Sequence, residues 1–151
     1  MPRFYLVLGL ILFISGCSIS DKQESPGKEV ITTDKAPAAI GVYSQGIKVR
    51  NTIYVSGQIG LVPETRELAE DDLESQVRQT IQNIEAILQA GGFELSDVVS
   101  ANVFLDDLSD YQAFNEIYIN YFPENPPSRM VVEAARIPLD AKVEIKVIAA
   151  K

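Results

Sequence analysis

Apolar residues recur every three to four positions between residues 73 and 90, which is the period of a helix with one buried face. The residues of this stripe are Leu73, Val77, Ile81, Ile84 and Leu88. Asp71 and Asp72 precede it, where negative charge favours the positive end of a helix, and Gly91-Gly92 follows it as a stop signal. The pattern predicts a helix from about Leu73 to Ala90.

A second helical pattern begins at Ser109, whose spacing to Gln112 matches a capping box. Its large apolar residues are Tyr111, Phe114, Ile117, Tyr118, Tyr121 and Phe122. Pro123 cannot continue a helix, so we expect the helix to end there. Such a wide aromatic stripe requires a broad apolar surface to cover it.

Five runs rich in β-branched residues predict the strands that provide this surface. They span Ile47–Val49, Thr52–Ser56, Val98–Leu105, Met130–Val132 and Val143–Ala149. The order β-β-α-β-α-β-β indicates an α+β sandwich with both helices on one face of a mixed sheet. Several strands are apolar or only mildly polar on the other face too, so we expect an oligomer that packs sheet against sheet.

The N-terminus has the pattern of an exported bacterial lipoprotein. Arg3 precedes an apolar run that ends at Ile14, which is shorter than the roughly 20 residues of a membrane span. The sequence from Ile14 to Cys17 resembles a lipobox, which implies cleavage before Cys17 and a lipid on its sulfur. The alternative is a strand or helix that buries Cys17 in the core. We expect a signal peptide over residues 1–16, a lipidated Cys17 with a flexible polar tether over 17–30, and one domain over 31–151.

Lipid on Cys17 would hold the protein on a membrane that it does not span. Ser18 follows Cys17, in place of the Asp that marks inner-membrane retention in some Gram-negative bacteria. We therefore expect an envelope protein, on the periplasmic face of the outer membrane if the host is Gram-negative.

The composition excludes several kinds of chemistry. The chain has no His, and its one Cys would be occupied by lipid, so His-based triads, Cys-His pairs and zinc sites with His or Cys ligands are excluded. The acidic clusters at 70–72 and 106–110 lack the ligand spacing of a calcium loop, and helix N-terminal charge explains them. With no phosphate-binding loop and no dinucleotide fingerprint, we expect neither a metal nor a cofactor.

The charge of the chain disfavours a nucleic-acid partner. The 13 basic residues against 21 acidic ones give a net charge of −8, and loss of Arg3 with the signal peptide would leave 12 against 21, or −9. The arginines do not cluster: Arg66, Arg78, Arg129 and Arg136 lie in four different segments. A polyanion would be repelled overall, so we predict no nucleic-acid binding.

Arg129 and Glu144 are the remaining candidates for chemistry, and we expect them on neighbouring strands. A guanidinium can hold a small carboxylate by two parallel hydrogen bonds. A carboxylate in a partly desolvated cleft can exchange protons with water near neutral pH. Local sequence also allows two surface charges, because Arg129 follows a proline turn and Glu144 lies between Lys142 and Lys146.

Longer motifs resemble the Rid (YjgF) family. They are Ala36–Gly46, Ser56–Ile59, Asn83, Ala90-Gly91, Val103–Asp110, Asn115, Pro127–Glu133 and Val143–Ile145, and the resemblance extends from Lys35 to Ala149. It implies a chorismate-mutase-like fold assembled as a homotrimer, with pockets in the clefts between subunits. The subgroup that the chain most resembles implies hydrolysis of 2-imino acids, such as 2-iminopropanoate and 2-iminobutanoate, to 2-keto acids and ammonia without a cofactor.

The same resemblance implies roles for individual residues. Arg129 would anchor the substrate carboxylate, and Glu144 would take a proton from the attacking water and return one to the departing amine. The Tyr43 ring would form one wall of the substrate pocket, and its hydroxyl would position water. The residues that would line the pocket beside them are Ser56, Gly57 and Asn115. Many family members carry Cys two positions after the Arg, where this chain has Val131, so the pocket wall would be more apolar here.

Two other functions stay open at this point. Export separates the protein from the cytoplasmic pyridoxal-phosphate enzymes that are expected to generate reactive imines. One alternative is therefore a non-catalytic trimer that binds a small carboxylate or presents a surface to an envelope protein. The other is hydrolysis of a different imine, enamine or amide bond by the same residues.

Overall fold

The computed structural model describes residues 27–151, so the expected signal peptide, Cys17 and most of the tether lie outside the described residues. We expected the tether to reach Val30, but Lys28–Ile31 form strand β1, which pairs antiparallel with β2 (Gly46–Val49). Ile31 is buried, so β1 contributes to the core. The folded domain therefore begins a few residues earlier than predicted and contains one more strand.

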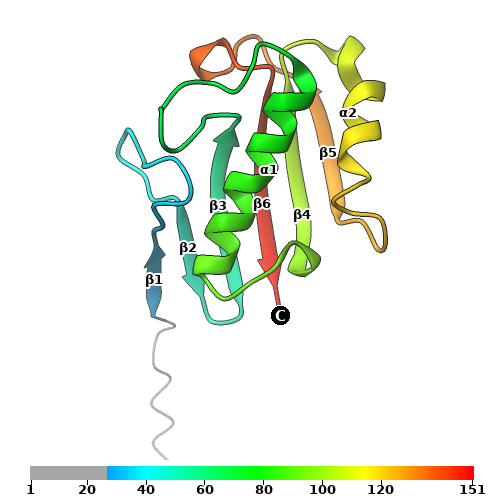
Figure 1. Cartoon of the computed structure of the whole chain (residues 1–151). Helices are drawn as coiled ribbons and strands as arrows, with labels where there is room; N and C mark the ends of the chain where they lie inside the picture. The colour runs from blue at the N-terminus through cyan, green and yellow to red at the C-terminus, as the bar shows by residue number, and fades with distance from the viewer. Residues whose placement is uncertain (1–26) are drawn as a thin grey trace, which may run out of the picture.

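Between residues 27 and 151, six strands form one mixed sheet in the order β1-β2-β3-β6-β4-β5. The remaining bounds are Thr52–Ile59 for β3, Val98–Leu105 for β4, Ser128–Glu133 for β5 and Val143–Ala150 for β6. Only β4 and β5 pair in parallel; every other pair is antiparallel. Both helices cover one face of this sheet, which confirms the predicted α+β architecture (Figure 1).

Helix α1 spans Leu73–Ala90, as the apolar period predicted. The Asp72 carboxylate caps it by accepting a hydrogen bond from the Ser75 backbone N–H at 2.8 Å. Gly91 ends the helix, and Gly92 takes a φ of 82°, a conformation that glycine adopts without strain. The Lys48 ammonium of β2 donates to the Gly91 carbonyl, and the ammonium of the C-terminal residue Lys151 to the Gly92 carbonyl, so these two lysines supply the positive charge that the last turn lacks.

Helix α2 spans Tyr111–Tyr118 and is shorter than predicted. The expected capping box at Ser109 is wrong, because a 3₁₀ turn over Leu108–Asp110 precedes the helix and the Asp107 carboxylate accepts the Ser109 N–H at 2.8 Å. The helix also ends before Phe122. That ring is nevertheless buried and stacks on Tyr118 with centroids 4.5 Å apart, so the aromatic stripe continues beyond the helix.

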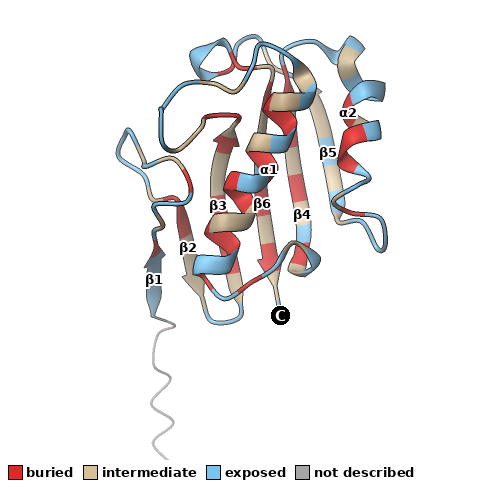
Figure 2. Cartoon of the chain, in the orientation of Figure 1, coloured by how far each residue is buried: buried red, intermediate tan, exposed pale blue. Residues whose placement is uncertain are grey.

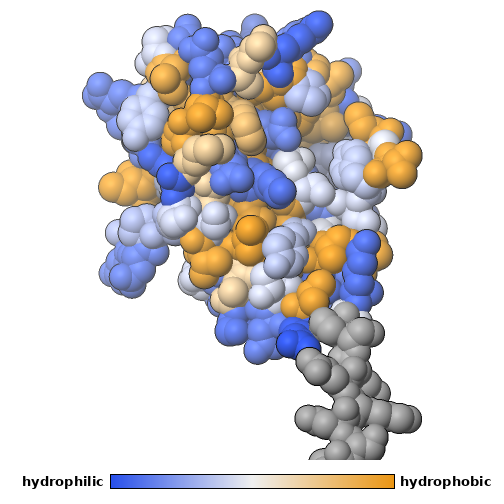
Figure 3. Space-filling view, turned by 180° about the vertical axis from the view of Figure 1, so that it is seen from behind, coloured by the Kyte–Doolittle hydropathy of each residue, from blue (hydrophilic) through white to orange (hydrophobic). Residues whose placement is uncertain are grey.

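The core lies between the helices and one face of the sheet, as the buried segments in Figure 2 show. Neither helix of residues 27–151 covers the opposite face (Figure 1), and Figure 3 shows apolar side chains exposed on the back of the molecule. Strand alternation and register place apolar side chains on this open face, namely Ile47, Tyr54, Phe104, Met130, Val132 and Ile148. Tyr54 and Met130 are 45% and 44% exposed. Of the helices within residues 27–151, none is long and apolar enough to cross a membrane.

Candidate active site

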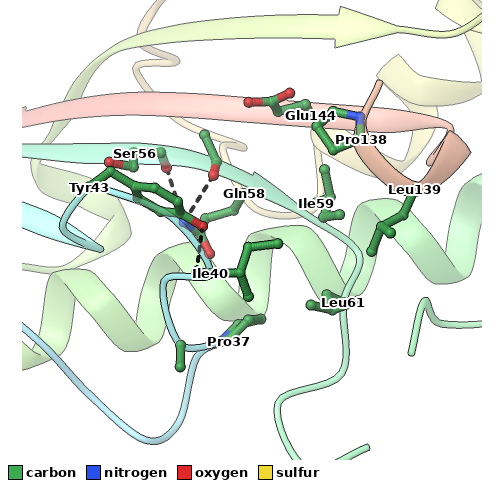
Figure 4. Close-up of a pocket in the computed structure, with 12 residues that line it drawn as sticks. Pro37, Ile40, Tyr43, Ser56, Gln58, Ile59, Leu61, Pro138, Leu139 and Glu144 are labelled. Atoms are coloured by element: carbon green, nitrogen blue, oxygen red, sulfur yellow. Dashed lines mark hydrogen bonds between the residues drawn. The ribbon is translucent and has the colours of Figure 1, made fainter. Parts of the chain in front are cut away.

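A cavity of about 340 Å³ lies beside the end of β3, between the 37–43 loop, β6 and the turn at 138–139. It is lined by Pro37, Ala38, Ile40, Tyr43, Ser56, Gly57, Gln58, Ile59, Leu61, Pro138, Leu139 and Glu144. Four of the seven residues that we predicted for the pocket are among them: Tyr43, Ser56, Gly57 and Glu144. Figure 4 shows Tyr43 and Ser56 toward one end of the cavity and Leu61 and Leu139 toward the other.

Glu144 is the one carboxylate among the residues that line this cavity. It alternates on β6 with buried Val143 and Ile145, so its side chain leaves the opposite face of the strand from the core. Burial raises the pKa of the Glu144 carboxyl above its ordinary value, because a partly apolar environment disfavours the charged form. A raised pKa suits a group that must both accept and return a proton near neutral pH.

Gly57 makes room for the Glu144 carboxylate. A Cβ at position 57 would overlap Glu144 Oε1, so only glycine fits beside this carboxylate without displacing it. The β3–β6 register shifts between Val55 and Gln58, which leaves Ser56 and Gly57 in an irregular segment of the strand. The Gln58 side-chain amide donates to the Ser56 and Gly57 carbonyls, both at 3.1 Å, and stabilises this irregularity.

Tyr43 and Ser56 supply hydroxyl groups at the polar end. The Tyr43 hydroxyl accepts a long hydrogen bond of 3.4 Å from the Ile40 backbone N–H, and half of the residue is exposed. Ser56 Oγ donates to the Ser44 carbonyl at 2.7 Å, which leaves the oxygen able to accept a hydrogen bond. Both groups can therefore contact a ligand or an ordered water.

The buried side-chain amides of Gln45 and Asn83 fix the walls of the cavity, and neither residue was predicted to have a role in the site. Gln45 accepts from the Thr33 N–H at 2.7 Å and donates to the Ala36 and Pro37 carbonyls, so it fastens the start of the 37–43 loop. Asn83 donates from α1 to the Ile59 and Leu61 carbonyls. Both amides occur within motifs of the family resemblance, which is the signal that could have identified them.

Arg129 lies elsewhere, against helix α2. Its Nη2 donates to Asn115 Oδ1 at 2.6 Å. Its guanidinium carbon lies 4.7 Å from the ring centroid of Tyr118 and 5.5 Å from that of Phe114, distances at which cation–π attraction is significant. Among the described residues no ion pair engages Arg129, so several of its five N–H donors remain for a ligand.

The expectation that Arg129 and Glu144 lie on neighbouring strands is wrong, because β4 separates β5 from β6. The register pairs Glu144 with Phe104 and Phe104 with Val132. Two strand spacings of about 4.8 Å and three residues of about 3.3 Å then place the Arg129 and Glu144 Cα atoms about 14 Å apart. Their side chains also leave opposite faces of the sheet, so a single chain cannot bring both to one small molecule.

The other predicted site residues divide in the same way. Asn115 lies with Arg129 on the helix face. Val131, expected in the pocket wall, packs against the hydrophobic core and does not line the Glu144 cavity. The apolar lining at Ile40, Leu61 and Leu139 was not predicted, because nothing in the local pattern shows that these loops meet.

Comparison with known proteins identifies the family. A family model described as Endoribonuclease L-PSP matches residues 33–151. A RutC family protein of Saccharolobus solfataricus is 50% identical over 124 residues, which are 82% of this chain and 98% of that protein. The 2-iminobutanoate/2-iminopropanoate deaminase of Rattus norvegicus is 43% identical over 122 residues, which are 81% of this chain and 89% of that protein.

A solved structure agrees with these relatives. The crystal structure of E. coli TdcF with bound serine matches with a TM-score of 0.77 and 36% identity, and the match covers 82% of this chain and 98% of that one. The chain therefore belongs to the Rid family, which the matching family model describes as Endoribonuclease L-PSP.

Proposed function

We propose that the protein hydrolyses 2-imino acids to 2-keto acids and ammonia. The observation that carries this proposal is Glu144, a carboxylate with a raised pKa in a cavity that also offers two hydroxyl groups. The deaminase name of the rat relative supports the same reaction class. General acid–base catalysis of this kind typically contributes about 10²- to 10⁴-fold in rate.

The reaction follows from the chemistry of these groups. Ionised Glu144 takes a proton from a water molecule, the resulting hydroxide adds to the imine carbon, and Glu144 passes that proton to the imine nitrogen. The intermediate then carries a hydroxyl and an amino group on one carbon. Ionised Glu144 then takes the hydroxyl proton and passes it to the amino group, so that the carbon–nitrogen bond breaks, ammonia leaves and the hydroxyl oxygen becomes the carbonyl oxygen of the keto acid. Tyr43 would hold the attacking water.

The proposal includes assembly as a homotrimer in which Arg129 of one copy faces the Glu144 cavity of the next. Arg129 and Glu144 lie about 14 Å apart on opposite faces of one chain, so a substrate anchored by Arg129 needs a second copy to meet Glu144. The apolar open face offers the surface for such packing. In this arrangement every site combines residues from two subunits.

Mixed trimers test both parts of the proposal. Glu144→Gln and Arg129→Ala are each expected to abolish most hydrolysis of imines that an amino-acid oxidase generates in place. Co-expressed with different affinity tags and purified through both, they should regain activity, because about one site in three of every trimer that contains both variants then has both wild-type residues. Activity that stays at the single-variant level in the mixed trimers would show that the site does not combine two chains.

Binding without catalysis is the second candidate function. The related TdcF structure contains serine, a small molecule with a carboxylate. If the unmodified trimer binds 2-oxobutanoate by calorimetry but hydrolyses no imine, a carboxylate-binding role replaces the enzymatic one. RNA cleavage, which the family description suggests, is disfavoured by the net charge of −8. Intact labelled RNA after prolonged incubation is the expected result.

We further propose that the chain is anchored through Cys17, on the strength of the sequence pattern alone. The family match begins at residue 33 and does not reach this segment. Mass spectrometry of membrane-extracted protein should find a lipid-modified Cys17 at the N-terminus, and Cys17→Ser should release the protein from the membrane. An unmodified chain that begins at Met1 would contradict the proposal.

A further inference from the structure

The Glu144 cavity has a polar end and an apolar end. Tyr43 and Ser56 form the polar end, Leu61 and Leu139 lie at the other end, and Glu144 lies between the two in the view of Figure 4. A methyl or ethyl group, the side chain of the two imino acids named above, would fill little of a cavity of about 340 Å³. Pockets of 300 Å³ or more ordinarily enclose much larger ligands, typically of about 300–1,000 Å³.

Leu139 reaches this cavity from an unusual backbone conformation. Its φ is 59° and that of Asp140 is 56°, so two consecutive residues other than glycine lie in the left-handed region. The Arg136 guanidinium holds the turn by a bidentate pair with the Asp140 carboxylate at 2.7 and 3.0 Å. Such strain, of about 1–3 kcal/mol per residue, is found chiefly where a site requires a particular geometry.

Leu139 is also 57% exposed and Ile40 is 77% exposed, although both are aliphatic. They stand at the mouth of a cavity that contains the candidate general base. An apolar ligand group would cover them and remove their surface from water, which is favourable. Strain and exposure at the same residue both point to contact with a ligand.

The charges around the cavity determine what it would reject. Among residues 27–151, no Lys or Arg lines it, and Glu144 supplies negative charge. Arg136, on the adjacent turn, is already engaged by Asp140. Arg129 of the neighbouring copy, which the proposed function brings to this cavity, is occupied by the carboxylate beside the imine carbon. A substrate side chain that ends in a second carboxylate would therefore lose its hydration without gaining a partner.

We propose that Leu139 is a specificity-determining residue, and that the apolar end of the cavity selects 2-imino acids with bulky aliphatic or aromatic side chains over those with acidic ones. The inference rests on the proposed function, because it assigns the substrate side chain of that same site. It also concerns a residue that takes no part in proton transfer, so specificity and rate can be separated by experiment.

The test compares imines generated from leucine, phenylalanine and glutamate by amino-acid oxidases. The wild-type protein is expected to favour the leucine-derived imine over the glutamate-derived one by about 10²-fold or more in kcat/KM. Leu139→Lys places a cation at the apolar end and should reduce that ratio by about 5- to 10-fold. Leu139→Gly removes the side chain and suits the positive φ, so it should lower the preference for leucine while the fold is retained.

Leu108→Lys is the matched control, because Leu108 is likewise an exposed leucine but does not line the cavity. It should leave the ratio unchanged. Equal wild-type kcat/KM values for the leucine and glutamate imines, or an unchanged ratio in both Leu139 variants, would overturn the inference. Dissociation of the Leu139→Lys trimer in sedimentation would also overturn it, because Leu139 would then be an interface residue.

Binding of the product keto acids separates this inference from the proposed function. Calorimetry with 4-methyl-2-oxopentanoate and 2-oxoglutarate should show the same preference and the same shift in Leu139→Lys. If the protein binds these acids with that preference but hydrolyses no imine, the deaminase proposal fails and the specificity role of Leu139 stands. If it hydrolyses all three imines equally and binds both acids equally, the specificity role fails and the deaminase proposal stands.

Discussion

The Glu144 side and the Arg129 side of this protein position a charged group by different means. Glu144 lies among loops and an irregular strand segment, beside a glycine whose missing Cβ leaves room for it. Arg129 lies on the regular part of the fold, where α2 provides three aromatic rings and the Asn115 amide. The first environment raises the pKa of the Glu144 carboxyl, whereas the second fixes the direction of the Arg129 guanidinium. Variants on the two sides should therefore fail in different ways.

The largest effect is expected from Glu144→Gln, which keeps the shape of the side chain and removes the proton acceptor. Turnover of 2-iminobutanoate should fall by about 10²- to 10⁴-fold. Binding of 2-oxobutanoate, measured by calorimetry, should change little. Glu64→Gln, at an exposed position outside the cavity, is the control. Full activity of Glu144→Gln would remove Glu144 from the mechanism.

Gly57→Ala should also slow proton transfer, because it moves Glu144. The added Cβ would displace the Glu144 carboxylate, and a misplacement of about 1 Å can lower a rate by about 10²-fold. Gly27→Ala is a matched control, because nothing lies within 4 Å of a Cβ at that position. Steady-state kinetics should show a lower kcat for Gly57→Ala, with the same oligomeric state as the unmodified protein in sedimentation. Equal rates for the two alanine variants would mean that the position of Glu144 does not limit the reaction.

Arg129→Ala should act on binding. Loss of a charge-assisted hydrogen bond weakens an interaction by about 1.5–3 kcal/mol, or roughly 10- to 150-fold in Kd. Affinity for 2-oxobutanoate should fall by that factor, and Arg129→Lys should recover only part of it, because an ammonium cannot form the bidentate pair. Arg78→Ala, at an exposed arginine paired with Glu74, should bind normally. Unchanged affinity in Arg129→Ala would place the carboxylate elsewhere.

The pH dependence of kcat/KM should reflect the ionisation of Glu144. Because burial raises the pKa of Glu144, the acid limb of kcat/KM should lie above 4.5, its ordinary value, and the rate should fall as pH falls through the raised pKa. Folding stability should change with pH in the opposite direction to the rate. The contribution of Glu144 to folding is fully present below its unfolded-state pKa and is lost as pH rises through the folded-state pKa. Glu144→Gln should therefore gain relative stability at neutral pH in urea titrations.

The smallest effect is expected beneath Arg129. The Tyr118 hydroxyl is buried without a hydrogen-bond partner among the described residues, and desolvation raises its pKa to about 12. Tyr118→Phe removes this unsatisfied group and keeps the ring under the guanidinium. Stability should be unchanged or rise by about 1 kcal/mol in denaturant unfolding, with keto-acid affinity retained. A loss of stability would show that the hydroxyl is hydrogen-bonded in the assembled protein.

The two sides also differ in how far the sequence predicts them. The helix over 73–90 follows from periodicity because a buried face imposes a local pattern, and the strand over 98–105 follows in the same way. The separation of Arg129 from Glu144 does not, because strand order depends on which edges pair, and β6 inserts between β3 and β4. Gly57 contacts Glu144 from a distant segment, and Ser56 and Leu139 line one cavity although they lie far apart in the sequence. Local pattern contains no information on them, and the family resemblance supplied only the residue identities.

Strand β1 has a mechanical consequence for a chain held by its N-terminus. It is an edge strand, joined to β2 by four residue pairs, and of its residues only Ile31 is buried. A pulling force that enters at Gly27 would therefore load this short ladder first, and weakly buried elements open at low free energy. Tension on the chain would peel β1 away before it reached Gln45 and the loop that this amide fastens. Opening of β1 would thus absorb the tension and leave the structure around the cavity unchanged.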